Sequence, residues 1–182
     1  MCRIPIFAAA LLLFAPGVIP AQAPADLSAL TKSMESAPPE QRLAFNALLV
    51  AFTTFRDAHV RHETCNLAAD CATRRNTERV SLDSGFGILV EKPSLPESKE
   101  DLTAADQTLN DYFQKVTDSL PESCPTTDCL SKSTFRDVQR DWIRYRDAWI
   151  TFAATHSPDI PPEKWRIYLT GQRSAQLLAR LG

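Results

Sequence analysis

Apolar side chains recur at helical spacing along two stretches of the chain. Positions 45, 48, 52 and 55 step by three and four residues, and positions 135, 138, 142, 145, 149 and 152 do the same. This spacing gathers apolar side chains on one face of an α-helix, and no useful length of the chain alternates as a strand would. The pattern predicts an all-α fold, a bundle of about five to six helices.

Two long helices and three shorter ones are expected, with bounds near 38–63, 131–156, 71–82, 103–120 and 161–181. The first long helix begins at the pair Pro38 and Pro39, which suits a first turn, and the second begins near an N-cap serine. The helix over 71–82 is expected to end before Gly85 and Gly87, which leaves residues 86–90 to lie across a groove of the bundle. Residues 27–36 are a candidate for one further helix.

The two long helices carry the same phrase. Phe52-Thr-Thr-Phe55-Arg56-Asp57-Ala58 recurs 90 positions later as Trp142-Ile-Arg-Tyr145-Arg146-Asp147-Ala148. We interpret the repeat as an internal duplication of a helical hairpin. It predicts a first unit over 26–90, a hinge rich in prolines and charges over 91–100, and a second unit over 101–182, the two units packing as one domain. The aromatic stripe of the second copy, which continues to Trp149 and Phe152, is expected in the core.

Residues 1–25 have the composition of a secretory signal peptide. Arg3 precedes an apolar run over 6–19, and small residues follow at Ala21, Ala23 and Ala25. The apolar run is too short to cross a bilayer as a stable helix, so we expect a periplasmic or secreted protein without a stable membrane anchor. Arg3 is the one charged residue of this segment, so the mature chain keeps 19 of the 20 basic residues and all 22 acidic ones. That balance does not suggest nucleic-acid binding.

Four cysteines remain after this cut, and an even number in an exported chain predicts disulfides. Close spacing favours Cys65 with Cys71 and Cys124 with Cys129, although duplicated hairpins would also allow crossed pairs. A zinc site that combines Cys65 with nearby histidines is the alternative. We disfavour it because oxidation competes for the thiols, so no metal is expected.

Three motifs in the second unit occur together. They are Ala105-Asp106-x-x-Leu109-Asn110-x-x-Phe113, Gln139-Arg140-x-Trp142-x-x-Tyr145-Arg146-Asp147-Ala148 and Leu169-Thr170-x-x-Arg173. Over about residues 101–181 they resemble the LprI-like lysozyme-inhibitor family, with a diverged copy over about 26–85. The resemblance implies an all-helical secreted or periplasmic domain, and some members of the family are credited with inhibiting lysozyme. We expect the motif residues to be structural: Leu109, Asn110, Gln139, Arg140, Trp142, Tyr145, Arg146, Asp147, Thr170 and Arg173.

The repeated Arg-Asp pair has a structural interpretation. Arg146 and Asp147 are adjacent and therefore about 100° apart around the helix, which makes a pair between them unfavourable. We expect each to reach a neighbouring helix instead. The specific hypothesis is that Asp147, or its counterpart Asp57, accepts from an arginine of the following helix, Arg173 or Arg79.

The function that we favour is a binding protein that blocks a peptidoglycan-cleaving hydrolase, with a self-protection or immunity role as a variant. Lysozyme-type hydrolases act through two carboxylates, and many are basic, so an inhibitor must cover the cleft and offer acidic complementarity. Binding is expected at the proline-rich loop from His156 through Asp159 to Glu163, and second at the loop with Asn66 and Asp70.

The sequence also bears on two other classes of function. A structural or interaction module of the envelope would expose an apolar patch near residues 86–90 or near Trp165 and Tyr168. An enzyme is disfavoured because the sequence has no nucleophile motif, no carboxylate pair set apart from helix-face charge and no glycine-rich phosphate loop. No cofactor is expected, and the sequence does not define the oligomeric state.

Overall fold

The computed structural model describes residues 27–64, 71–97, 101–124 and 129–181. These residues form only helices and no strand, which confirms the all-α prediction. The predicted signal peptide lies outside them. None of the helices in the described ranges is both long enough and apolar enough to cross a membrane. In chain order the elements are α1 (Leu27–Ser33), the 3-10 turn η1 (Met34–Ser36), α2 (Pro39–His62), α3 (Cys71–Glu91), α4 (Leu102–Ser119), α5 (Lys132–His156) and α6 (Pro162–Leu181).

Most helix ends lie where the sequence predicts them. Pro39 begins α2, and Ser131 caps α5 by accepting a hydrogen bond from the backbone amide of Thr134 at 3.3 Å. Asp101 caps α4 in the same way, accepting from the amide of Ala104 at 2.8 Å. These side-chain oxygens satisfy amide groups that have no partner within the first turn of a helix.

The exception is α3, which continues through Gly85 and Gly87 to Glu91. The prediction that it ends before the glycines is wrong, and residues 86–90 are its last turns rather than a segment lying across a groove. Phe86 explains the difference, because its ring stacks on Phe52 with centroids 4.1 Å apart and meets Trp149 edge-on at 5.5 Å. Burying that ring outweighs the cost of about 1 kcal/mol that each glycine adds to a helix interior.

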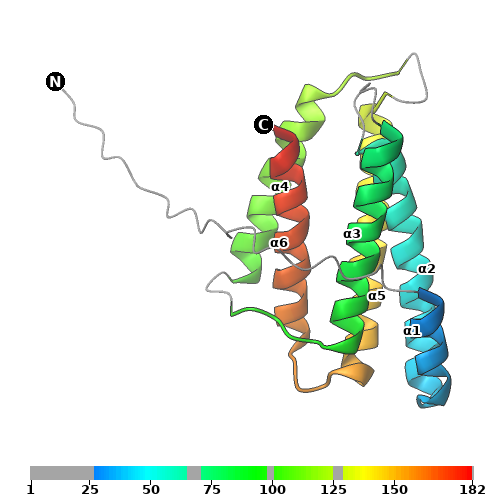
Figure 1. Cartoon of the computed structure of the whole chain (residues 1–182). Helices are drawn as coiled ribbons and strands as arrows, with labels where there is room; N and C mark the ends of the chain where they lie inside the picture. The colour runs from blue at the N-terminus through cyan, green and yellow to red at the C-terminus, as the bar shows by residue number, and fades with distance from the viewer. Residues whose placement is uncertain (1–26, 65–70, 98–100, 125–128, 182) are drawn as a thin grey trace.

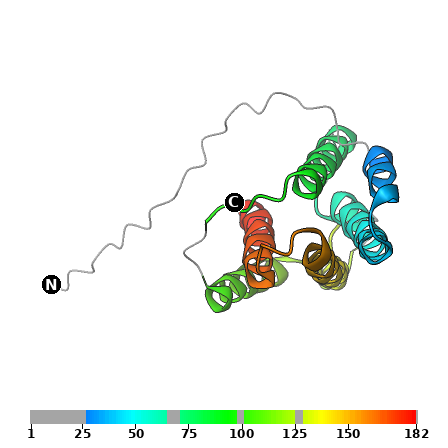
Figure 2. The same cartoon turned by 90° about the horizontal axis from the view of Figure 1, so that it is seen from below.

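The two copies of the repeated phrase lie against each other. Helices α2 and α5 are antiparallel and form the most extensive helix pair of the bundle (Figure 1). Helix α3 folds back beside α2, and α6 folds back beside α5, where α4 packs closely on α6. Viewed along the helices, α1 and α3 lie on the side of α2, and α4 and α6 on the side of α5 (Figure 2).

The core is aromatic where α2 meets α5. The ring of Tyr145 lies 5.6 Å from that of Phe52 and 5.7 Å from that of Phe55, so the two copies of the phrase pack directly together. Trp149 is 1% exposed and contacts Trp165 of α6 at 5.3 Å. The predicted burial of the stripe Trp142, Tyr145, Trp149 and Phe152 is confirmed.

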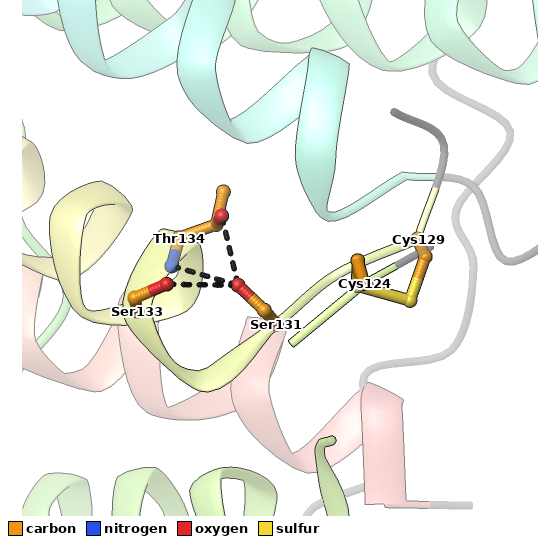
Figure 3. The surroundings of a disulfide bond; sticks show 5 residues. All are labelled: Cys124, Cys129, Ser131, Ser133 and Thr134. Carbon is orange, nitrogen blue, oxygen red and sulfur yellow. Dashed lines mark hydrogen bonds between the residues drawn. A yellow bond between two sulfur atoms is a disulfide. The ribbon is translucent and has the colours of Figure 1, made fainter. Parts of the chain in front are cut away.

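One predicted disulfide lies just before α5. Cys124 and Cys129 are bonded, with Cα atoms 5.5 Å apart, and the bridge lies beside the capping Ser131 (Figure 3). It closes the connection from α4 to α5. The other favoured pair involves Cys65, which lies outside the described residues, so its bond to Cys71 stays a prediction.

Candidate functional site

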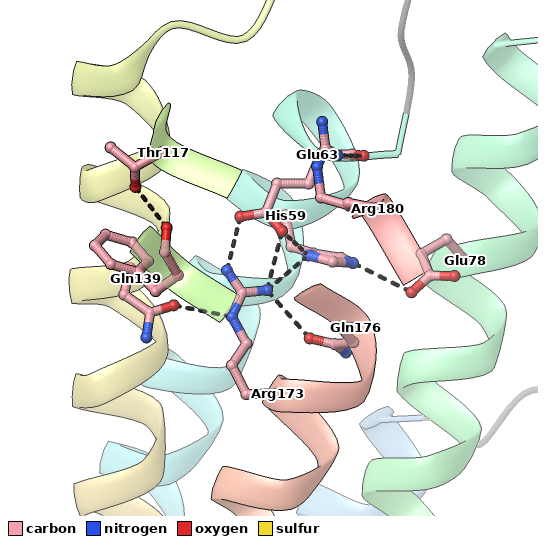
Figure 4. A network of polar contacts seen from close by, with 9 residues as sticks. His59, Glu63, Glu78, Thr117, Gln139, Arg173, Gln176 and Arg180 are labelled. Atoms are coloured by element: carbon pink, nitrogen blue, oxygen red, sulfur yellow. Dashed lines mark hydrogen bonds and ion pairs between the residues drawn. The ribbon is translucent and has the colours of Figure 1, made fainter. Parts of the chain in front are cut away.

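A buried ion-pair network joins helices from both halves of the chain (Figure 4). The guanidinium of Arg173 on α6 donates to both carboxylate oxygens of Glu63, at 2.8 and 2.9 Å, and the two side chains are 0% and 1% exposed. Its Nε donates to Gln139 of α5 at 2.9 Å, and its Nη1 donates to Gln176 at 3.1 Å. Every side of the guanidinium is therefore held by the protein itself.

His59 extends the network to α3. Its Nδ1 lies 3.0 Å from the Glu63 carboxylate and its Nε2 lies 3.2 Å from the Glu78 carboxylate. Burial alone would lower the pKa of His59, but the hydrogen bonds to Glu63 and Glu78 raise it above its ordinary value of 6.5. Only the imidazolium donates from both nitrogens, so this geometry favours the charged form.

The charge of Glu63 is stabilised from several sides. Burial alone would raise the pKa of this carboxyl, but the charge of Arg173 and hydrogen bonds from His59 and Arg173 lower it to about 2. Arg180 also donates to the Glu63 backbone carbonyl, at the end of α2. The network is thus a closed set of paired charges that fixes how α2, α3, α5 and α6 meet.

The hypothesis about the repeated Arg-Asp pairs is correct for one copy. Arg79 donates to Asp57 at 2.8 Å, as predicted, and both side chains are partly exposed. For the second copy it is wrong, because Arg173 pairs with Glu63 and leaves Asp147 at the surface. Glu63 is the residue that sequence reasoning missed, although its place four residues after His59 in the last turn of α2 was a usable signal.

The expectation that adjacent Arg and Asp side chains do not pair is also wrong. Arg146 contacts Asp147 at 3.0 Å, and Arg56 contacts Asp57 at 2.9 Å. In the second copy the guanidinium of Arg146 lies 5.2 Å above the ring of Trp142, one turn earlier. A long side chain that lies along its own helix spans the 100° between adjacent positions, which a shorter one would not.

The remaining motif residues divide between core and surface. Leu109 and Thr170 are buried, whereas Asn110 is exposed and Arg140 pairs with the exposed Asp137 at 2.8 Å. Of the motif residues, Arg173 and Gln139 take part in the buried network. Among the described residues no set of three His, Cys, Asp or Glu side chains could hold a metal ion.

The predicted binding loop lies between α5 and α6, and His156 has a structural role there. Its Nδ1 lies 2.6 Å from the Gln41 amide nitrogen, and its Nε2 lies 2.8 Å from the backbone oxygen of Val90. Its ring stacks on Phe152 at 4.6 Å. His156 thus ties the end of α5 to the start of α2 and the end of α3, and both ring nitrogens are already engaged.

Most of the rest of this loop faces solvent, except for the buried Ser157 and the half-buried Ile160. Asp159 and Glu163 are exposed, as are the three prolines of the loop. Two backbone hydrogen bonds of 3.0 Å, from Ile160 to Ser157 and from Lys164 to Pro161, fix its path. The loop borders an apolar hollow of about 160 Å³, whose lining includes Ile150, Ala154, Pro158 and Trp165. The second predicted binding loop, with Asn66 and Asp70, lies outside the described residues.

A larger groove of about 500 Å³ runs between α3 and α6. Its floor is made by Phe52, Phe55, Trp142 and Tyr145, which are the paired aromatics of the repeated phrase. All four are nearly covered, and Tyr145 is the most exposed of them at 8%. The groove is lined by none of the residues of the loop between α5 and α6.

The apolar patch expected of an interaction module is absent from the two places predicted for it. Phe86, Leu89, Val90 and Trp165 are buried, and Tyr168 is half-buried. The prediction failed because the end of α3 and the start of α6 both pack into the core. Ile88, at 47% exposed, is the one large apolar side chain of residues 86–90 that reaches solvent.

Residues 97–177 match the family model described as Lysozyme inhibitor LprI. This stretch is an LprI lysozyme-inhibitor domain. The match confirms the family resemblance. Searches of the curated proteins and of the solved structures gave no significant match.

The LprI domain contains α4, α5 and most of α6, and with them Gln139 and Arg173. Glu63 and His59 lie outside it. The central arginine of the LprI domain is therefore neutralised by a carboxylate from the first half of the chain. The preceding helices α2 and α3 complete the domain's interior electrostatically as well as sterically.

Proposed function

We propose that this protein is exported and inhibits a lysozyme-type hydrolase that cleaves peptidoglycan, as a means of self-protection. The observation that carries the proposal is the LprI match over residues 97–177. The binding element is the loop from Ser157 to Glu163, presented by the ends of α5 and α6.

The loop has the mechanical properties of an inhibitory element. Its prolines fix backbone torsions, and the backbone hydrogen bonds at Ile160 and Lys164 hold its two turns. A loop that is already ordered loses little conformational entropy on binding, so more of the contact energy appears as affinity. Ser157 is buried and His156 is fixed by Gln41, so the base of the loop cannot swing freely.

Its charge suits a basic partner. Asp159 and Glu163 are exposed in the loop, whose base His156 holds at the end of the bundle where α2 begins and α3 ends. Carboxylates presented together at one end attract a basic enzyme during encounter and disfavour acidic partners. Specificity for hydrolases with a positively charged rim around the cleft follows.

The apolar hollow beside the loop supplies an anchor point. Its volume of about 160 Å³ accommodates one medium-sized apolar side chain of the partner, between Pro158 and the Trp165 ring. Interfaces gain most of their energy from a few such anchors inserted in well-packed pockets, with the surrounding contacts excluding water.

The test is an inhibition assay with the mature chain, residues 26–182, against chicken-type, goose-type and bacterial lysozymes. The proposal expects at least one of these enzymes to lose activity in proportion to added protein at micromolar concentration. Activity of all three that is unaffected at that concentration would overturn it.

A further inference from the structure

The groove between α3 and α6 has the dimensions of a ligand site. Both helices pack on the central pair of α2 and α5, but they do not pack on each other. The space left between them, about 500 Å³, is within the range of 300 to 1,000 Å³ typical of small-molecule sites. On the α3 side, the groove is lined in part by two small residues, Ser81 and Gly85.

The groove offers no unpaired charge. Glu78 and Arg173 are the charged residues that line it. Arg173 is held by Glu63 at 2.8 Å, and Glu78 accepts from His59 at 3.2 Å. A charged ligand would lose hydration without gaining a counter-ion, so the lining favours an uncharged one.

One polar group in the groove has no partner. The hydroxyl of Tyr145 makes no hydrogen bond to any described residue, although the side chain is more than nine-tenths buried. Burial raises the pKa of this phenol, so it remains a protonated donor. The hydroxyl oxygen itself is not sealed in the core, so it is available to donate to a ligand in the groove.

The rim adds neutral hydrogen-bonding groups. Ser81 of α3, Ser94 of the hinge and Gln172 of α6 line the groove and are exposed. Tyr168, half-buried, presents its ring beside them and accepts a hydrogen bond from Gln172 at 2.6 Å. The rim of the groove therefore contains hydroxyl, amide and aromatic groups.

We propose that this groove binds an uncharged saccharide of one or two rings. A pyranose presents carbon–hydrogen faces to aromatic side chains and hydroxyl groups at its edges. The half-buried ring of Tyr168 complements such a face, and the Tyr145 hydroxyl and the polar rim complement the edge hydroxyls. A purely aliphatic ligand would leave the Tyr145 hydroxyl without a partner. The inference is separate from the inhibitory loop, since the groove and the loop share no residue.

Gly85 gives a clean way to block the groove. A Cβ at this position would meet nothing within 4 Å, so Gly85→Leu fills the groove without disturbing α3 and adds helix propensity. Gly171→Leu on α6 is the matched control, because a Cβ there also meets nothing within 4 Å and the residue does not line the groove. Tyr145→Phe removes the unpartnered hydroxyl alone.

The experiment is a titration of the mature protein with N,N′-diacetylchitobiose, followed by amide chemical shifts, with the de-N-acetylated dicationic disaccharide as charge control. We expect saturable shifts around Tyr145 and Gly85 with the neutral sugar. Binding should weaken at least tenfold in Gly85→Leu, weaken about fivefold to tenfold in Tyr145→Phe, and stay unchanged in Gly171→Leu. Absence of shifts at millimolar sugar, equal binding by Gly85→Leu, or tighter binding of the dication would overturn the proposal.

Discussion

Arg173 near the end of the chain and Glu63 at the end of α2 form a two-pronged ion pair, although 110 residues separate them in sequence. Both side chains are sealed from solvent. The pair crosses between the LprI domain and the helices that precede it. An LprI domain isolated as residues 97–182 would lack both Glu63 and the face of α2 on which α5 packs, so we expect that fragment not to fold stably.

Removal of the arginine charge tests this pair. Arg173→Met keeps much of the side-chain volume but removes the guanidinium that pairs with both oxygens of Glu63, and leaves His59 as the remaining cationic partner of this buried carboxylate among the described residues. Breaking a buried pair in this way costs about 3–5 kcal/mol. Urea denaturation of the mature protein should therefore show a large fall in the midpoint, with an unchanged dependence on denaturant.

The double variant Glu63→Gln with Arg173→Met is the control for this experiment. Because no charge is left unpaired, it should recover more than half of the lost stability, and a double-mutant cycle should show strong coupling between the sites. A single variant as stable as the wild-type protein, or a double variant no better than the single, would contradict this interpretation.

The pair between Arg79 and Asp57 should matter far less. Its side chains are 42% and 48% exposed, so water and salt screen their attraction. We expect Asp57→Asn to lower the free energy of unfolding by under about 1 kcal/mol. The same urea experiment measures this loss. A loss comparable to that of Arg173→Met would contradict the argument that an exposed ion pair contributes less to the free energy of unfolding than a buried one.

Stability should decline at both ends of the pH range. The pKa of Glu63 is lowered to about 2, so its contribution is full above the ordinary value of 4.5 and is lost as pH falls toward 2. The pKa of His59 is raised above 6.5, so its contribution is full below 6.5 and is lost as pH rises through the folded-state value.

The measurement is the free energy of unfolding as a function of pH, for the wild-type protein and for His59→Gln. The variant should lose the decline on the alkaline side and keep the decline in acid. An alkaline decline of equal size in both proteins would assign it to another group.

The disulfide between Cys124 and Cys129 closes a short loop and should stabilise modestly. Chain-entropy arguments for a loop this size give about 2 kcal/mol. Thermal denaturation of the double variant Cys124→Ser with Cys129→Ser should show a small fall in Tm and an unchanged helical circular-dichroism spectrum. Loss of the helical spectrum would mean that the bridge is required for the protein to fold, and not only for a modest increase in stability.

Much of the fold could be predicted from the sequence because helical periodicity, proline pairs and capping serines are local signals. The beginnings of α2, α5 and α6 depend on such signals. The end of α3 does not, because Gly85 and Gly87 argue locally for a stop. The helix continues because Phe86 finds Phe52 and Trp149, which are distant in sequence.

The candidate site was less predictable for the same reason. Spacing alone showed that Arg173 should reach another helix, but the choice of Glu63 over Asp147 depends on which helix ends meet in space. His156 belonged to the predicted binding loop by sequence position, yet Gln41 and Val90 from other helices engage its ring. Asp159 and Glu163 remain as the exposed acids of the loop.

The most direct test of the inhibitory role compares two charge-matched variants in the lysozyme assay. Asp159→Asn with Glu163→Gln removes two carboxylates from the loop, and Asp111→Asn with Asp118→Asn removes two exposed carboxylates from α4. The account predicts that the loop variant inhibits at least about tenfold more weakly, with the difference shrinking at high salt, while the α4 variant inhibits like the wild-type protein. Equal inhibition by the loop variant and the wild-type protein would contradict it.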